Sequence, residues 1–235
     1  MITDTLFIIP ARGGSKGLPK KNILPINGKP MICYTIDAAR GLTSDENICV
    51  STDDLEIKEI VESYGLKVHF LRPADLATDT AGTRDVLLHA IDFYETKLGK
   101  TYKRICLLQP TSPLRKSKHI KEAIELWEDH LDMVVSVKES KANPYFNLFE
   151  EKEGGFLKKL KEGDYTRRQD APKVWEYNGA IYIINIHELK YMQITGLKKV
   201  KKYIMSEENS LDIDDLWDFE LAKIIIKIMH SAGQP

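Results

Sequence analysis

The sequence predicts an α/β fold in which a mostly parallel sheet is covered by helices on both faces. Short apolar runs alternate with helix-like segments through the first half of the chain, and this alternation is typical of βαβ units. At 235 residues, 43% of them hydrophobic, the chain is long enough for one buried core. We therefore treat residues 1–235 as a single domain. In such folds ligands bind beyond the carboxyl ends of the strands, so the loops that follow strands are where chemistry is expected.

The first half of the chain contains a series of predicted strands. Thr5–Pro10 is apolar throughout and precedes a glycine-rich stretch, which indicates a strand buried on both faces. The other runs with strand character are Asn47–Ser51, Lys67–Leu71, Arg104–Leu108 and Asp132–Val137. Helices are expected between them. Pro30 suits the start of the first helix, and residues with capping side chains precede the next three: Asp53 or Asp54, Thr83, and Ser117.

The alternation stops between about residues 143 and 174, where the chain is rich in Lys, Glu and Gly. This stretch nevertheless carries the apolar side chains Tyr145, Phe146, Phe149, Phe156 and Leu160. Two interpretations fit: a solvated loop, or a projecting arm that buries these side chains against another subunit. Beyond it the pattern returns, with strands predicted at Asn178–Asn185 and Lys201–Met205 and a closing helix at Asp214–Ala232.

Composition excludes several classes of protein. With 34 basic and 35 acidic residues, the net charge of −1 supplies no general attraction to nucleic acid or to a membrane surface. No apolar run approaches the roughly 20 residues of a membrane helix, and the N-terminal run resembles no signal peptide. The three cysteines, Cys33, Cys49 and Cys106, lie in separate apolar runs. We therefore expect buried, reduced thiols and a cytoplasmic protein.

The loop from Ala11 to Asn22, directly after the first strand, predicts a phosphate-binding site. It contains three glycines and four cations, Arg12, Lys16, Lys20 and Lys21, and has no acidic residue. Glycines let successive backbone N–H groups fold around an anion, and fixed positive charge stabilises a departing pyrophosphate. The spacing matches neither the P-loop nor the dinucleotide-binding fingerprint. The alternative is a basic surface loop, which the position after a buried strand disfavours.

A second motif, Asp212-Ile213-Asp214, lies near the C-terminus. In an extended segment this spacing places both carboxylates on one side, where they can bind one hard cation such as Mg²⁺. The same aspartates precede a predicted helix, whose positive end they would also stabilise as caps. The spacing fits both roles.

Three weaker motifs also follow strands or precede helices. Gln109 lies in a loop stiffened by two prolines and can bond a sugar hydroxyl or carboxylate. The segment Arg72–Thr83 ends at a helix start, where N–H groups can meet a base or ribose. Paired arginines at Arg167 and Arg168 can clamp a carboxylate.

Taken together and in this order, the five motifs resemble those of the acylneuraminate cytidylyltransferases, the CMP-sialic acid synthetase family. The resemblance runs from IIPARGGSKGLPKKN to SLDIDDLWDFELA, which is nearly the whole chain. It implies a Rossmann-like, three-layer α/β/α fold with a mixed sheet, and a homodimer formed through the arm. It also implies joining of CMP from CTP to the anomeric hydroxyl of a nine-carbon acidic sugar, with Mg²⁺ as cofactor and release of pyrophosphate.

The resemblance assigns roles to individual residues of this chain. The triphosphate loop contains Ala11, Arg12, Ser15, Lys16, Lys21 and Asn22, and residues beside cytosine and ribose are Arg72, Ala81 and Thr83. Asp212 and Asp214 match the metal-binding pair, and the acidic-sugar pocket would contain Gln109, Arg168, Asn178 and Tyr182. Arg12, Lys21 and Asp214 are the expected catalytic residues.

The sequence leaves the identity of the sugar open. Several bacterial sialic acid enzymes have R-Q-Q-L-P where this chain has Arg168–Pro172. Legionaminic and pseudaminic acids are served by similar sequences, and the resemblance extends to synthetases for the eight-carbon sugar of lipopolysaccharide. Two other classes share some of these features: a glycosyltransferase that holds a nucleotide-sugar, and a non-catalytic nucleotide sensor. The position of the aspartate pair before the last helix disfavours the first, and retention of all five motifs disfavours the second.

Overall fold

The computed structural model describes residues 1–15 and 17–231 and centres on one six-stranded sheet. The strand order is β10-β6-β9-β5-β1-β4. The strands are β1 (Thr5–Pro10), β4 (Ile48–Ser51), β5 (Arg104–Leu107), β6 (Met133–Glu139), β9 (Trp175–Asn185) and β10 (Val200–Ile204). β1 pairs in parallel with β4 and β5, and β10 pairs in parallel with β6, whereas β9 runs antiparallel to both of its neighbours. The predicted mixed, mostly parallel sheet is confirmed.

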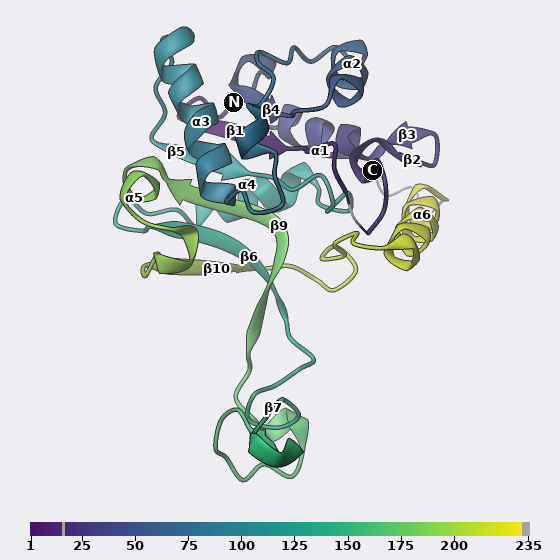
Figure 1. Cartoon of the computed structure of the whole chain (residues 1–235), viewed down its shortest axis with the longest axis vertical. Coiled ribbons are helices and arrows are strands. Elements are labelled where there is room, and N and C mark those ends of the chain that lie inside the picture. The colour runs from purple at the N-terminus through teal and green to yellow at the C-terminus, as the bar shows by residue number, and fades with distance from the viewer. Residues whose placement is uncertain (16, 232–235) are drawn as a thin grey trace.

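Helices cover both faces of this sheet (Figure 1). They are α1 (Met31–Arg40), α2 (Leu55–Ser63), α3 (Thr83–Lys97), α4 (Ser117–Glu125), α5 (Ile186–Tyr191) and α6 (Leu216–Ser231). Side chains alternate across the buried strand β1. Phe7 and Ile9 pack in one core with α1, α2 and α4, while Leu6 and Ile8 pack in a second core with α3 and α5. The three-layer α/β/α architecture is therefore present.

A third, smaller core joins the C-terminal helix to the body. It contains Ile26, Met31 and Leu114 from the body, with Ile213, Phe219, Ala222 and Ile226 from the C-terminal segment. Ile26 belongs to a short hairpin, β2 (Pro25–Ile26) and β3 (Lys29–Pro30). Ile213 is fully buried. Its burial fixes the segment that carries both predicted metal ligands.

Several local predictions need correction. Lys67–Leu71 forms no strand: it contributes one isolated bridge, Thr52 to Leu71, because the Val68 N–H donates to the Glu62 side chain rather than to a neighbouring strand. Of the predicted caps, Asp54 is confirmed, since its side chain accepts from the N–H groups of Glu56 and Ile57.

The other two predicted caps are wrong. Thr83 and Ser117 are the first residues of α3 and α4, and Gly82 and Lys116 occupy the cap positions. The Ser117 hydroxyl instead donates to the Ala38 carbonyl, which ties α4 to α1. The closing helix begins at Leu216 rather than at Asp214, and Ala232 lies outside the described residues.

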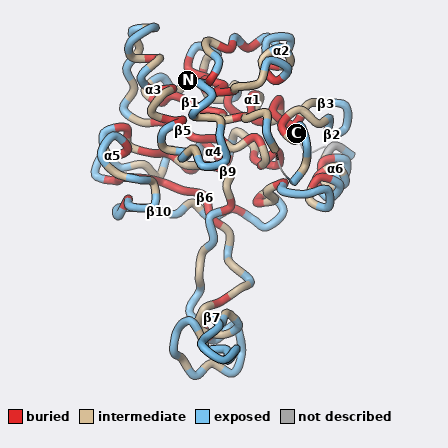
Figure 2. Tube along the Cα trace, viewed as in Figure 1, coloured by how far each residue is buried: buried red, intermediate tan, exposed pale blue. Residues whose placement is uncertain are grey.

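The segment between β6 and β9 projects from the body as an arm (Figure 1). A short antiparallel hairpin, β7 (Phe149–Glu151) with β8 (Leu157–Lys159), lies in the arm. Most of the arm is exposed (Figure 2). Phe156 and Leu157 are 76% and 69% exposed. The arm lies in the part of the chain where the sequence predicts an excursion, and its role in dimerisation stays a prediction.

Short 3-10 turns connect the larger elements: Lys21–Ile23, Asp45–Asn47, Ala74–Leu76, Glu153–Gly155, Arg168–Asp170 and Ile194–Gly196. All three cysteines are free and buried, as predicted. Across the described residues, no helix has the length and apolar character needed to cross a membrane.

Candidate active site

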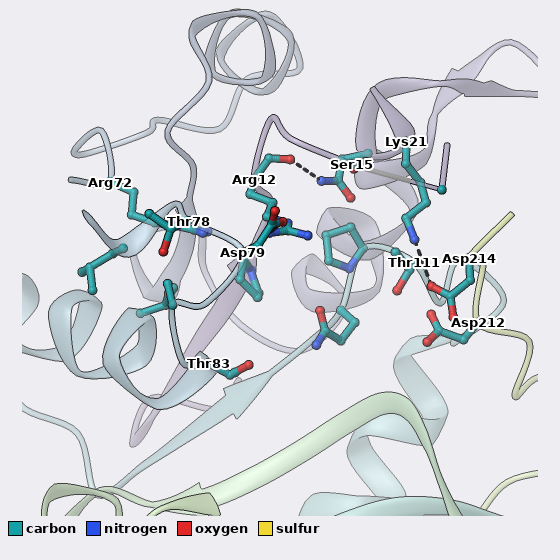
Figure 3. Close-up of a pocket in the computed structure, with 18 residues that line it drawn as sticks. Arg12, Ser15, Lys21, Arg72, Thr78, Asp79, Thr83, Thr111, Asp212 and Asp214 are labelled. Carbon is teal, nitrogen blue, oxygen red and sulfur yellow. Dashed lines mark hydrogen bonds and ion pairs between the residues drawn. The ribbon is translucent and has the colours of Figure 1, made fainter. Parts of the chain in front are cut away.

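A cavity of about 620 Å³ opens beyond the carboxyl ends of β1 and β5 (Figure 3). It is lined by residues of four of the five motifs: Arg12, Ser15, Lys21, Asn22, Arg72, Ala81, Thr83, Gln109, Asp212 and Asp214. Segments some 200 residues apart in the chain therefore meet in one place. The convergence of the basic loop and the aspartate pair that the sequence predicts is present in the structure.

Hydrogen bonds hold the basic loop in place at both of its ends. Ala11 is fully buried and its N–H donates to the Ser51 carbonyl at 2.9 Å, which extends the pairing of β1 with β4. Asn22 is also buried, and its side-chain amide donates to the Arg12 carbonyl at 3.0 Å. These two residues shape the loop around the cavity. Lys16, a predicted phosphate ligand, lies outside the described residues.

The loop also approaches the aspartate segment closely. A Cβ atom on Gly17 would lie 2.5 Å from the Asp214 carbonyl oxygen, so no larger residue fits there without a shift of backbone. Lys21 donates to the Ile213 carbonyl at 2.5 Å and forms an ion pair with the Asp214 carboxylate at 3.1 Å. The first and last motifs of the chain are thus in direct contact.

Arg12 and Lys21, two of the cations that line the cavity, are each paired with a carboxylate of its wall. Lys21 pairs with Asp214, and the Arg12 guanidinium lies 2.8 Å from an Asp79 carboxylate oxygen (Figure 3). Arg12 and Asp79 are both partly exposed, so their pair is easily exchanged for another anion. A phosphate group carries the same kind of charge as these carboxylates and can replace them.

The two aspartates differ in environment. The Asp214 side chain is 80% exposed, whereas Asp212 is half-buried and its Oδ1 has no hydrogen-bond partner among the described residues. Burial raises the pKa of Asp212, against the lowering effects of a Thr111 hydrogen bond and of Lys21. A buried carboxylate oxygen without a partner is costly unless a cation binds it.

This donor set fits a divalent cation that also binds phosphate. The described residues contain no cluster of three or more His, Cys, Asp or Glu side chains that could hold a metal alone. Mg²⁺ commonly takes one or two protein carboxylates and completes its shell with water and phosphate oxygens. Two aspartates beside a cavity that is also lined by cations match that preference.

Arg72 lines the same cavity but uses much of its guanidinium inside the protein. It is 6% exposed, and its Nε and Nη2 groups donate to the Ser51 hydroxyl and carbonyl. Ala81 and Thr83 lie on the same wall, where α3 begins. The predicted residues of the base and ribose site are therefore neighbours, and Arg72 also fixes the end of β4.

The residues predicted for the sugar pocket are separated into three places. Gln109 and Tyr182 line a cavity of about 370 Å³ that shares Thr83 and Gln109 with the main cavity. Asn178 borders a different cavity of about 470 Å³, beside Asp212 and Asp214. Arg168 lies in an exposed turn of the arm and lines neither of them. Within one chain, these four residues do not form one pocket.

The two side cavities differ in charge. The cavity with Gln109 and Tyr182, here called the neutral cavity, also contains Gln193, Thr195 and Arg84. The charge of Arg84 is balanced by an ion pair with Asp85 at 3.6 Å, and its guanidinium also donates to the backbone carbonyls of Leu189, Lys190 and Met192. The cavity with Asn178, here called the acidic cavity, is lined by Glu176, Glu207, Glu208, Asp212, Asp214 and Asp218, with Lys138.

Sequence reasoning missed Asp79, Arg115 and the Gln193–Thr195 segment. Arg115 is 2% exposed and donates to the carbonyls of Gln109 at 3.1 Å and Ala180 at 3.0 Å. Burial lowers its pKa to about 10. Its place after the proline loop was visible in the sequence, but its burial was not. Gln193–Thr195 carries no motif, so only the fold brings it to the cavity.

Comparison with known proteins gives consistent matches. The model of the cytidylyltransferase family matches residues 6–217. The chain is 35% identical to the post-translational flagellin modification protein B of Campylobacter coli, over 96% of each chain. It is 33% identical to the CMP-N,N'-diacetyllegionaminic acid synthase of Legionella pneumophila, over 97% of this chain and 98% of that protein.

Other relatives are longer. The chain is 40% identical to the N-acylneuraminate cytidylyltransferase of Escherichia coli O18:K1:H7, over 94% of its own length but 52% of that protein. Among solved structures, a CMP:2-keto-3-deoxy-manno-octonic acid synthetase complexed with CTP aligns with a TM-score of 0.69 at 17% identity. That alignment covers 95% of this chain and 98% of the other, and it supports the fold.

Proposed function

The chain belongs to the cytidylyltransferase family, and from this premise we propose that it joins CMP from CTP to the anomeric hydroxyl of a nine-carbon acidic sugar and releases pyrophosphate. One observation carries the proposal: the basic loop and the aspartate pair line one cavity at the carboxyl edge of the sheet. The predicted family and the predicted class of enzyme, a nucleotidyltransferase, are confirmed by the family match and by the relatives.

The phosphates of CTP are proposed to lie along the basic loop. Arg12 and Lys21 would exchange their carboxylate partners for phosphate oxygens, and the cytosine and ribose would lie toward Arg72, Ala81 and Thr83. Fixed cations at the leaving phosphates stabilise the charge that develops as pyrophosphate departs. Phosphoryl transfer needs little covalent help from protein groups, so positioning and charge account for most of the expected catalysis.

Asp212 and Asp214 are the residues that would hold Mg²⁺. The ion would neutralise phosphate charge and lower the pKa of a hydroxyl bound to it. Before substrate binds, Lys21 would hold the Asp214 segment against the basic loop. Asp212, with its free buried oxygen, is the stronger of the two ligands on this view.

The neutral cavity is the proposed sugar site. A substrate carboxylate in the acidic cavity would face several like charges, which costs free energy. The neutral cavity offers amide, hydroxyl and phenol groups, and it opens into the main cavity beside Gln109. Burial raises the pKa of Tyr182, so its phenol stays protonated and can donate. A sugar placed there can extend its anomeric hydroxyl toward the α-phosphate.

We further propose a homodimer in the cytoplasm. The arm exposes Phe149, Phe156, Leu157 and Leu160, an apolar surface that a second copy would cover. A second copy would also bring its own Arg168 toward a site that lacks that residue within one chain. Free, buried cysteines suit a reducing compartment.

A pyrophosphate-release assay with CTP, Mg²⁺ and a panel of acidic sugars tests the proposal. The panel should include N-acetylneuraminic, legionaminic and pseudaminic acids and the eight-carbon 3-deoxy-octulosonic acid. Release that requires both CTP and one of the nine-carbon acids is expected. Binding of CTP without turnover on any member of the panel would contradict it. Light scattering of the purified protein checks the dimer.

A further inference from the structure

Strand β9 leaves regular pairing beside the aspartates. Val135 of β6 pairs with Tyr182, and Val137 pairs with Tyr177, so residues 178–181 of β9 lie opposite Ser136 alone. This irregularity is a bulge that bends the strand. Gly179 within it has a φ of +76°, a left-handed conformation that favours glycine. The bulge turns toward Asp212: a Cβ atom on Gly179 would lie 3.1 Å from the Asp212 Oδ2 atom.

The side chain of Asn178 holds this bulge and is fully used in doing so. Its Oδ1 accepts from the Ser136 hydroxyl at 2.6 Å and from the Ala180 N–H at 3.2 Å. Its Nδ2 donates to the Ser210 hydroxyl at 2.9 Å and contacts the Met205 sulfur at 3.4 Å. An amide side chain has two acceptor sites and two N–H donors. All four are occupied, and the residue is 3% exposed, so no group is left for a sugar.

The bond to Ser210 leads to the metal-binding segment. Residues 205–215, all of them described, form neither helix nor strand, so their position depends on individual contacts. Ser210 is buried, accepts from Asn178 and donates to the Ser206 carbonyl at 2.7 Å. Two residues later comes Asp212.

On the far side of Asp212, the Ile213 N–H donates to the Thr111 carbonyl at 2.9 Å. The aspartate is therefore held from both directions.

We propose that Asn178 is a positioning residue for Asp212 and makes no contact with the sugar. Through Ser210 it fixes the segment that carries the Asp212 carboxylate beside the cavity, and thereby sets the affinity of the site for a divalent cation. The inference rests on the proposed function, because it takes Asp212 as a metal ligand. Residues that orient a metal ligand typically contribute about 10- to 100-fold to metal affinity.

The test compares Asn178→Ala and Ser210→Ala with a matched control, Asn185→Ala. Asn185 lies at the other end of β9 and caps α5 by accepting from the His187 N–H, so its loss affects the fold but not the bulge. Mn²⁺ binding in the presence of CTP is measured by electron paramagnetic resonance of the free ion. Thermal unfolding and steady-state kinetics are measured on the same variants. We expect both bulge variants to weaken Mn²⁺ binding about tenfold or more. The KM for the sugar at saturating metal should stay within about twofold, and Ser210→Thr should restore Mn²⁺ binding because it keeps the hydroxyl.

Two results would overturn the inference. A raised sugar KM in Asn178→Ala, with normal Mn²⁺ binding in Ser210→Ala, would make Asn178 a sugar contact. Loss of thermal stability with unchanged Mn²⁺ affinity in both variants, as in the Asn185 control, would make its role purely structural. If Asn178→Ala does not fold, Ser210→Ala decides alone. Failure of the proposed function is distinguishable, because the unsubstituted protein would then bind Mn²⁺ with CTP but release no pyrophosphate.

Discussion

The proposed phosphate side and the proposed sugar side of the site satisfy their polar groups in different ways. On the phosphate side, Arg12 and Lys21 form ion pairs with Asp79 and Asp214, and in the proposed binding mode a triphosphate replaces these carboxylates. On the sugar side, the neutral cavity offers uncharged amide, hydroxyl and phenol groups. Charge exchange and neutral hydrogen bonding respond differently to substitution. The first should mainly change turnover and CTP affinity, and the second should change the KM for the sugar.

The largest effect is expected from Asp212→Asn, which removes the charge of the half-buried carboxylate. Turnover should fall by about 10² or more, because the proposed metal site loses its main ligand. Stability should not fall with it. Burial raises the pKa of Asp212, so its ionised form opposes folding at neutral pH, and this cost falls as the pH drops from the raised pKa to the ordinary pKa of an aspartate.

The neutral Asn should therefore unfold at a temperature no lower than the parent at pH 7. Glu208→Gln is the control, since Glu208 is an exposed acid of the neighbouring acidic cavity. If both variants kept normal turnover with Mg²⁺, Asp212 would have no part in the mechanism.

Next in size is Lys21→Met, on the phosphate side. Lys21 is largely buried and joins the basic loop to Ile213 and Asp214, so its loss should reduce kcat by about 10- to 100-fold. Lys20→Met removes the same charge from the adjacent, exposed residue, which pairs with Glu56 away from the aspartates, and should change kcat less than about threefold. Steady-state kinetics distinguish the two. Unchanged kcat with weaker CTP binding would restrict Lys21 to binding.

Tyr182→Phe examines the sugar side. Removing one hydroxyl that donates to a neutral partner costs about 1 kcal/mol, so the KM for the sugar should rise roughly fivefold. The KM for CTP should stay unchanged. Tyr191→Phe, at an exposed tyrosine, is the control. A change in the KM for CTP but not for the sugar would place the sugar elsewhere, and would remove the difference between the two sides.

Much of this site could be predicted from sequence because its parts are local. The loop Ala11–Asn22 and the pair Asp212–Asp214 are short motifs next to predictable elements, and the parallel sheet brings loop ends together at one edge. The arm was predictable from a break in the alternation of apolar and polar residues.

What the sequence could not predict depends on tertiary context. Lys67–Leu71 has strand composition but pairs with no strand beyond one bridge, because the Glu62 side chain takes the Val68 N–H. Asn178 has the right residue type for a sugar contact, yet the bulge opposite Ser136 buries it. Gln193–Thr195 reaches the neutral cavity only through the turn after α5. Burial and bulges are set by partners distant in sequence, which no local motif encodes.

The smallest effect, and the one opposite in sign, is expected from Asp79→Asn. Asp79 pairs with Arg12 in the main cavity, so in the proposed binding mode it competes with the triphosphate for the same guanidinium. An exposed ion pair contributes about 0.2–1 kcal/mol, which corresponds to a gain in CTP affinity of at most about fivefold when the competitor is neutralised. The gain should shrink as salt is added, because screening weakens the pair in the parent protein.

Asp75→Asn is the control. Asp75 lies in the turn before Asp79, at an exposed position outside the cavity lining, so removal of its equal charge should leave the affinity for CTP nearly unchanged. Calorimetric titration with CTP at two salt concentrations measures both. Weaker CTP binding in Asp79→Asn would mean that the carboxylate contacts the nucleotide instead of competing with it, and charge exchange would no longer describe this side of the site.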